Sequence, residues 1–187
     1  MTAGPTIRGM KDLKSSTTWW EHLKTDRGAF EAWLHDQYRG EVTAAGRIES
    51  LRDAFAPKES RAYRILTAIA GQERKHATWV AELLRARGLD VHVEPVEDRY
   101  WKRTVPEVID LETGAAVGAH AEQMRLERIE AIARDEHAPP DVRAVFQRIL
   151  PEERFHARAF RSLSSPSAMS RTAHAHDLGR RALGLAP

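Results

Sequence analysis

Four stretches of the chain carry hydrophobic residues at the alternating spacings of three and four that an amphipathic helix produces. We predict helices over residues 26–55, 60–87, 106–136 and 141–163. Aspartate or serine stands at the start of the first, second and fourth, where its side chain can cap the first turn. The pattern therefore predicts an all-α protein, with four long helices that bury their apolar faces against one another.

The links between these helices differ in length. Those between the first and second helices and between the third and fourth are short, which makes each pair antiparallel neighbours. Residues 89–106 break the helical pattern, and Pro95 argues against a central strand, so we expect an extended crossover there. Such a crossover allows the second and third helices to run parallel.

The chain divides into three parts on this basis. Residues 1–25 form an N-terminal extension with a short helix, which we expect to be capped at Thr18. Residues 26–163 form the four-helix bundle. Residues 164–187 are expected to be a flexible tail or a weakly docked helix.

Ionisable residues interrupt all four apolar faces. Each predicted helix places a glutamate among its apolar positions, and two of them add a histidine three residues later: Glu41, Glu73 with His76, Glu122, and Glu153 with His156. Residues three apart lie on one helix face, about one turn from each other. Burying such groups is costly unless something pairs with them, and a metal ion is one such partner.

The spacing of these glutamates repeats. Glu41 precedes Glu73 by 32 residues, and Glu122 precedes Glu153 by 31. The chain thus contains a helix with Glu followed by a helix with Glu-x-x-His, twice over. One Glu-x-x-His is expected by chance in a chain of this composition, but two at matched positions indicate a shared site.

This residue set is the one described for carboxylate-bridged di-iron and di-manganese bundles. Over residues 26–163 the chain resembles the ferritin-like superfamily, which includes ferritins, rubrerythrins and small di-iron oxidases and hydroxylases. The resemblance implies a ferritin-like four-helix bundle with one long crossover between helices two and three. It also implies two Fe ions, with Mn possible, bridged by Glu73 and Glu153, with Glu41 and Glu122 as terminal ligands and His76 and His156 each on one metal.

Some alternatives remain open at the site. Glu152 stands four residues before His156 and can replace Glu153 as a ligand. The six groups can also form a metal-free network of hydrogen bonds. Without metal, four buried carboxylates cannot all stay ionised, so we expect their pKa values to rise.

Two further residues are candidates for catalysis. Arg125 lies on the third helix where a Glu-x-x-His motif would have its histidine. It either clamps an anionic substrate, pairs with a ligating carboxylate, or forms a structural ion pair. Tyr38 lies about one turn before Glu41, beside Gln37. Either of these two can hydrogen-bond a ligand, and Tyr38 serves as a redox-active neighbour or as a packing residue.

Small residues gather at the level of the glutamates, at Ala44–Gly46, at Ala68, Ala70 and Gly71, and at Gly114–Ala119. They either leave a cavity for oxygen or substrate, or allow the helices to pack closely.

Composition narrows the class of protein. The 187 residues contain no cysteine, which excludes disulfides and thiolate metal sites. The net charge is only +2, so nucleic-acid binding is not expected. No apolar stretch is long enough for a membrane span, and the N-terminus lacks the apolar core of a secretory signal, so we expect a cytoplasmic protein.

We expect a non-haem di-iron oxidase or oxygenase, such as a monooxygenase, that activates O2 and oxidises a small-molecule substrate. It would need an external electron donor, and a homodimer is possible. A rubrerythrin-like peroxidase and a ferritin-like iron-handling protein are the alternatives, although the cages of ferritins are usually acidic outside. A metal-free structural bundle is a fourth possibility.

Overall fold

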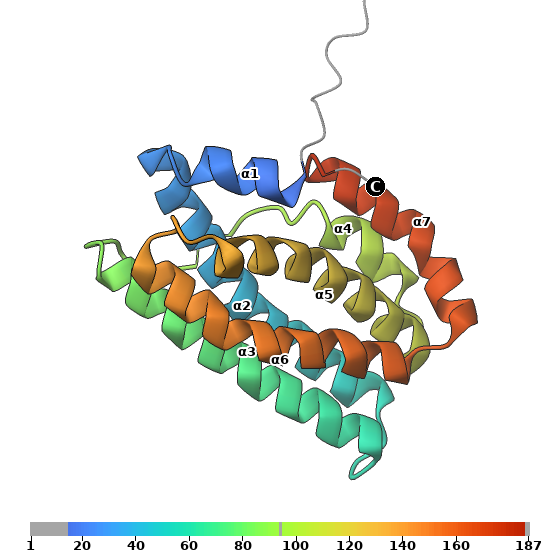
Figure 1. The fold of residues 1–187 in the computed structure, drawn as a ribbon. Coiled ribbons are helices and arrows are strands. Elements are labelled where there is room, and N and C mark those ends of the chain that lie inside the picture. The colour runs from blue at the N-terminus through green and yellow to red at the C-terminus, as the bar shows by residue number, and fades with distance from the viewer. Residues whose placement is uncertain (1–14, 94, 186–187) are drawn as a thin grey trace, which may run out of the picture.

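The computed structural model describes residues 15–93 and 95–185. This part of the chain forms seven α-helices and one short 3₁₀-helix (Figure 1): α1 (Ser16–Leu23), α2 (Arg27–Phe55), α3 (Arg61–Arg85), α4 (Trp101–Thr104), η1 (Val105–Glu107), α5 (Leu111–Arg134), α6 (Pro140–Leu163) and α7 (Pro166–Ala182).

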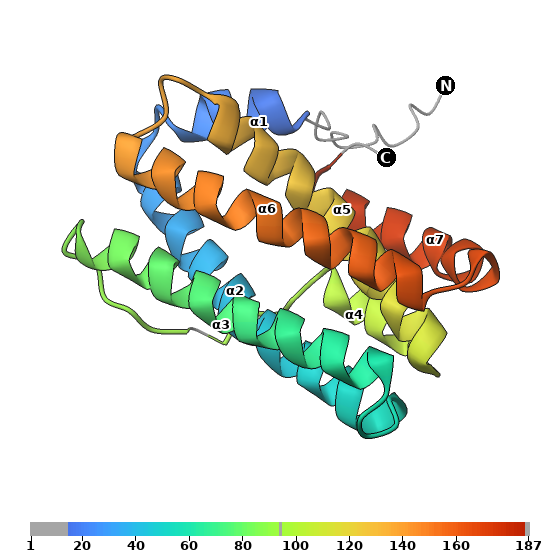
Figure 2. The same cartoon turned by 60° about the horizontal axis from the view of Figure 1, so that its bottom comes forward.

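The four long helices form two antiparallel hairpins. α2 packs along α3, and α5 packs along α6 (Figure 2). The hairpins meet mainly where α3 contacts α6, whereas α2 and α5 touch much less. A crossover of residues 86–100 joins α3 to α4, so the predicted all-α bundle with one long crossover is confirmed.

Local signals fix the starts of the helices. Asp26 accepts a hydrogen bond from the Ala29 N–H, and Ser60 accepts one from the Tyr63 N–H, as predicted for the caps of α2 and α3. The short N-terminal helix begins differently from the prediction, because Ser15 rather than Thr18 is its cap.

The helices of the second hairpin also begin elsewhere than predicted. α5 starts at Leu111 instead of residue 106, because Asp110 and Thr113 form a reciprocal capping box. The residues just before it form α4 and η1 instead. α6 starts at Pro140, which suits the first position of a helix because it has no N–H to satisfy. Asp141 therefore lies in the first turn and is not the cap.

The core divides into two apolar clusters along the bundle. One contains Trp20, Phe30, Trp33 and Phe146, beneath α1. The other lies toward the opposite end and includes Ile48, Leu66, Ile69 and Phe160. On each long helix the interrupting glutamate falls between the residues of these two clusters, so apolar side chains close off its level from both ends.

The sequence left two alternatives for residues 164–187, a flexible tail or a weakly docked helix. The described part of this segment contains α7, which packs against α5 and α4 and buries Ala168, Thr172, Ala175 and Gly179. The structure therefore supports the docked helix. Gly179 is needed there, because a Cβ atom would lie 2.6 Å from the Tyr100 ring. Tyr100 Oη is hydrogen-bonded to His176 Nδ1 (2.8 Å), so α7 holds the crossover in place.

Within residues 15–93 and 95–185, no helix has both the length and the apolar character needed to span a membrane.

Candidate metal centre

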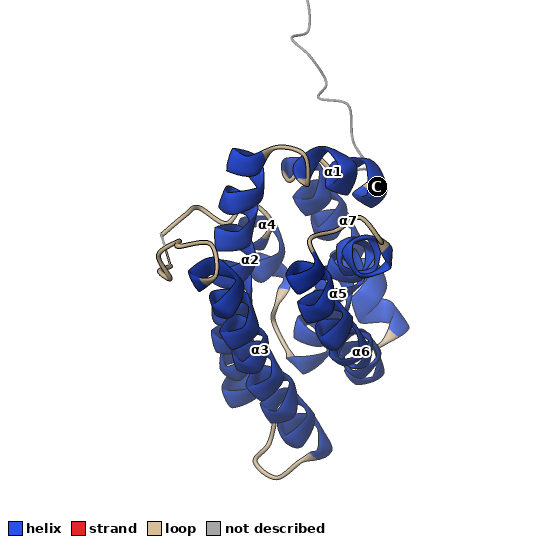
Figure 3. Ribbon diagram, turned by 60° about the vertical axis from the view of Figure 1, so that its left-hand side comes forward, coloured by secondary structure: helices blue, strands red, loops and turns tan. Residues whose placement is uncertain are grey.

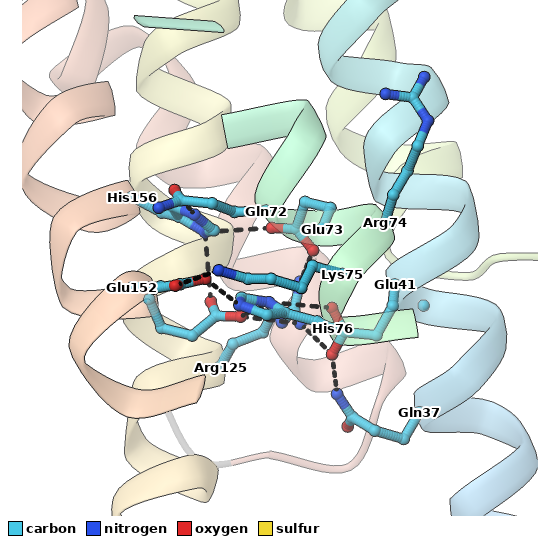
Figure 4. A network of polar contacts seen from close by, with 12 residues as sticks. Gln37, Glu41, Gln72, Glu73, Arg74, Lys75, His76, Arg125, Glu152 and His156 are labelled. Carbon is cyan, nitrogen blue, oxygen red and sulfur yellow. Dashed lines mark hydrogen bonds and ion pairs between the residues drawn. The ribbon is translucent and has the colours of Figure 1, made fainter. Parts of the chain in front are cut away.

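The structure brings the six predicted metal ligands together in the middle of the bundle. Figure 4 labels four of them, Glu41, Glu73, His76 and His156. The exposed fraction is 5% for Glu122 and 0% for the other five predicted ligands. Their ligand atoms form two groups of four, each within 4.8 Å: Glu41, Glu73, His76 and Glu153, and Glu73, Glu122, Glu153 and His156. Glu73 and Glu153 belong to both groups, which is the arrangement that two bridging carboxylates require.

The separations between these atoms suit shared cations. His156 Nδ1 lies 3.1 Å from Glu73 Oε1, and His76 Nδ1 lies 3.2 Å from Glu153 Oε1. Two atoms that each ligate one ion at about 2.1 Å are roughly 3 Å apart. The carboxylate and imidazole atoms are therefore already spaced like neighbouring ligands.

Each predicted ligand leaves one of its polar atoms without a hydrogen bond to the described residues. Each of the six residues has one buried polar atom without a hydrogen-bond partner in the described chain: Glu41 Oε2, Glu73 Oε1, His76 Nδ1, Glu122 Oε2, Glu153 Oε2 and His156 Nδ1. Most buried polar atoms in proteins are satisfied. Six unpartnered atoms converging from four helices form a nitrogen and oxygen donor set that fits Fe, Mn or Zn.

The outer nitrogen of each imidazole is held by a residue that the sequence analysis did not assign to this role. His76 Nε2 donates to Glu152 Oε2 (2.8 Å), and His156 Nε2 donates to Gln72 Oε1 (2.9 Å). Each partner directly precedes the glutamate of the other Glu-x-x-His motif. Because these oxygens only accept, the proton is on Nε2, and Nδ1 is turned toward the carboxylates.

These contacts argue against the alternative considered above, in which Glu152 replaces Glu153 as a ligand. One of its carboxylate oxygens is engaged by His76 and the other lies 2.5 Å from Lys75 Nζ. Glu153 is fully buried, and its carboxylate lies among the other predicted ligands. The structure favours Glu153 as the ligand and Glu152 as the residue that orients His76.

We expect Glu152→Ala to weaken metal binding by about 10- to 100-fold, because the ring of His76 loses its orienting partner. Competition with a chelating dye measures this affinity. Lys75→Ala is the control, since it removes the other partner of Glu152 and leaves the bond to His76. An affinity unchanged by Glu152→Ala would contradict the assignment.

Arg125 lies inside the carboxylate cluster. Its Nη2 donates to Glu41 Oε1 (2.7 Å) and Glu153 Oε1 (3.3 Å), and its Nη1 to Glu73 Oε2 (3.4 Å). Of the three roles considered above, the structure supports pairing with the predicted ligands. Each of these carboxylates gives one oxygen to the guanidinium and keeps its other oxygen unpartnered.

Arg125 also explains why the four carboxylates titrate differently. Burial raises the pKa of Glu73 to about 7, and burial together with the neighbouring Glu153 raises the pKa of Glu122 well above its usual value. Burial acts on Glu41 as well, but Arg125 and His76 outweigh it and hold the pKa of Glu41 at about 2. The pKa of Glu153 is likewise held well below its ordinary range, against burial, by Arg125 and the two histidines. The expectation that all four pKa values rise is therefore wrong for Glu41 and Glu153.

Tyr38 and Gln37 have separate surroundings. Gln37 Nε2 donates to Glu41 Oε1 (2.5 Å), so it is the residue of this pair that contacts a predicted ligand. Tyr38 packs against the apolar cluster that contains Trp33 and Phe146, and it lines a groove formed by residues of α2 and α3. We assign Tyr38 a packing role.

A cavity of about 810 Å³ reaches the site from the side where α2 faces α5. Glu122, Arg125 and Gln37 line it. Gly114 and Gly118 of α5 have both of the roles considered for the small residues: they line the cavity, and they let side chains of α2 and α6 pack closely against α5. A Cβ atom on Gly118 would lie 2.7 Å from the Phe160 ring, and one on Gly114 would lie 2.1 Å from Leu51 Cδ1.

Comparison with known proteins agrees with this geometry. A family model described as Rubrerythrin matches residues 33–164, more than two thirds of the 187 residues. No curated protein and no solved structure matches the chain. The matched span contains all six predicted ligands, the whole of α3, α5 and α6, and α2 from Trp33 onward. The chain belongs to the rubrerythrin family, a di-iron family of the ferritin-like superfamily.

Proposed function

We propose that this protein is a non-haem di-iron oxidoreductase that uses O2 to oxidise a small organic substrate. The observation that carries the proposal is the pair of four-residue groups sharing Glu73 and Glu153, with a substrate-sized cavity ending at Glu122. Sites of about 300–1,000 Å³ typically hold small molecules, and iron storage has no need of one.

The residues of the chain divide the work of the site. Two ferrous ions held by the six ligands would supply electrons and Lewis acidity for O2 chemistry. Glu152 and Gln72 fix the imidazoles, so that Nδ1 of each remains available. The four carboxylates offset the charge of two divalent ions, which leaves Arg125 as an additional positive charge at the inner end of the cavity.

An oxygenase reaction requires electrons and protons in addition to O2 and the substrate. Inserting one oxygen atom of O2 into a C–H bond reduces the other to water and consumes two electrons and two protons. The chain has no cysteine and so no rubredoxin-type iron site. An external electron donor is therefore part of the proposal.

Oxygen uptake tests this function. Protein loaded anaerobically with Fe(II) is expected to consume O2 in proportion to its bound iron, as followed with an oxygen electrode. Glu153→Ala, which removes a residue common to both groups, is expected to abolish that uptake. Uptake no faster than that of free Fe(II) in buffer would contradict the proposal.

A rubrerythrin-like peroxidase is the second candidate, and the family match favours it. In that case hydrogen peroxide would oxidise the diferrous protein much faster than O2 does. Stopped-flow mixing with each oxidant separates the two functions. Assembly into a large cage, measured by light scattering, would indicate iron storage instead.

A further inference from the structure

The cavity between the two hairpins extends well beyond the metal level. It is bounded on one side by α2 from Asp36 to Phe55 and on the other by α5 from Gly114 to Arg125. Figure 3 shows the α2–α3 hairpin and the α5–α6 hairpin as two separate pairs of helices. Because α2 and α5 touch little, side chains of both helices remain available to a bound molecule.

The walls of the cavity are mostly apolar away from the metal level. Leu51 and Phe55 of α2 and Val117 of α5 line that part, together with Val105 and Val108 next to α4. The charged residues Glu122 and Arg125 line the opposite, inner end. A molecule that fills this space must be apolar over most of its length.

Arg47 lies between these two ends. It follows Glu41 by six residues, which corresponds to about 9 Å along α2. Its guanidinium carbon lies 4.1 Å from the centre of the Trp101 ring, which fixes its position over α4. The nearest carboxylate oxygen, Asp98 Oδ2, is 3.8 Å from Nη1, too far for a hydrogen bond.

The charge of Arg47 is poorly compensated. Its Nε is buried and has no hydrogen-bond partner in the described chain. Burial, reinforced by the nearby charge of Arg125, lowers the pKa of Arg47 to about 10 despite the presence of Asp98. A guanidinium in this state gains from an anion that supplies the missing hydrogen bonds.

The two other arginines that line the cavity are already committed. Arg39 Nη2 lies 2.9 Å from Asp36 Oδ1. Arg125 donates to three carboxylates of the metal cluster. Of these three arginines, Arg47 is the one whose guanidinium makes no hydrogen bond to a described residue, since its contacts are the long ion pair with Asp98 and the Trp101 ring.

We propose that the cavity binds an elongated, mainly apolar carboxylate, whose carboxylate group pairs with Arg47 and whose chain extends between Leu51 and Val117. This inference rests on the proposed function, since it names the substrate class of the same site. It places the carboxylate end of the molecule nearer to the metal cluster than the end of its chain.

Calorimetric titration with matched amphiphiles tests the proposal. Decanoate, decanol and decylamine share one chain and differ in charge, and all are used below the concentrations at which they form micelles. We expect decanoate to bind at least tenfold more tightly than the other two, and hexanoate to bind more weakly than decanoate. Equal binding of decanoate and decanol would overturn the proposal.

Variants of the lining arginines locate the anion. Charged hydrogen bonds contribute about 1.5–3 kcal/mol, so Arg47→Gln is expected to weaken decanoate binding by roughly 10- to 100-fold and to leave decanol binding unchanged. Arg47→Lys should recover part of the loss, because it keeps the charge. Arg39→Gln is the matched control and should not affect the preference for decanoate. An equal loss of decanoate and decanol binding in Arg47→Gln would mean that Arg47 only shapes the cavity.

Metal content and oxygen uptake, measured on the same samples, separate this inference from the proposed function. A protein that prefers decanoate through Arg47 but consumes no O2 would contradict the function and support the ligand class. A protein that consumes O2 but does not distinguish decanoate from decanol would contradict the inference alone.

Discussion

Replacing Glu153 by alanine is expected to eliminate both metal ions, whereas replacing Glu122 is expected to eliminate only one. The reason lies in the overlap of the two ligand groups. Glu153 belongs to both, while Glu122 belongs only to the group that contains His156. Losing a shared carboxylate removes a ligand from each ion and also part of the negative charge that holds the two cations close together.

The same reasoning applies to Glu73 and Glu41. Glu73→Ala should lose both ions, as Glu153→Ala does, because Glu73 also belongs to both groups. Glu41→Ala should lose only the ion of the group that contains His76 and keep the ion of the group that contains His156. Elemental analysis after loading with Fe(II) or Mn(II) and removal of free metal measures the number of ions bound per chain.

Glu82→Ala, at an exposed position of α3, is the control for nonspecific effects and should retain the full complement. Circular dichroism shows whether each variant keeps its helices. Full metal occupancy in a folded Glu153→Ala protein would show that the shared position is not a bridge.

Replacing Arg125 by leucine is expected to destabilise the metal-free protein far more than the metal-loaded one. Arg125 is hydrogen-bonded to Glu41, Glu73 and Glu153, which have exposed fractions of 0%. Removing one partner of a buried ionic network typically costs about 3–5 kcal/mol, because the remaining charges lose their compensation. For a domain of this size, that loss corresponds to a decrease in Tm of roughly 6–20 °C.

Metal ions change this balance, because two divalent cations supply the positive charge that the carboxylates need. The loss in the loaded protein should therefore be much smaller. Thermal unfolding followed by circular dichroism, with chelator and with Mn(II), measures both values. Arg134→Leu is the control, since Arg134 lies on the same helix and forms an exposed ion pair with Glu130. Equal losses with and without metal would contradict a compensating role for Arg125.

The pH dependence of the metal-free protein should change in the same variant. Burial would raise the pKa of Glu41, but Arg125 and His76 hold it at about 2. Ionised Glu41 therefore stabilises the folded state above the ordinary carboxyl pKa, and this contribution is lost as the pH falls toward 2. Arg125→Leu should lack much of this contribution, so its deficit in Tm is expected to shrink on acidification.

The apolar periodicity predicted the four long helices, and the errors occurred at their ends. α5 was predicted from residue 106, but the capping box of Asp110 and Thr113 makes it start at Leu111. The sequence left α7 as one of two alternatives, because the buried face of this helix consists of small or polar residues, such as Ala168, Thr172 and Gly179. Such residues give little hydrophobic signal, and they become a packing face only because α5 and Tyr100 cover them.

The candidate site was predictable for a related reason. A helix fixes which residues share a face, so the spacing of Glu73 with His76 and of Glu153 with His156 is enough to indicate a metal site. The sequence by itself thus determined the helices, their inward faces and the six candidate ligands, because these depend on residues close together in the chain.

Only the tertiary structure decided how these groups are paired. Gln72 binds His156, and Glu152 binds His76, each across 84 or 76 residues of sequence. The position of Arg125 among three carboxylates, the selective rise in the pKa values of Glu73 and Glu122, and the cavity beside Arg47 also depend on how one hairpin lies against the other. Contacts between distant segments are set by the packing of whole helices, and the periodicity of a single helix contains no information about its neighbour.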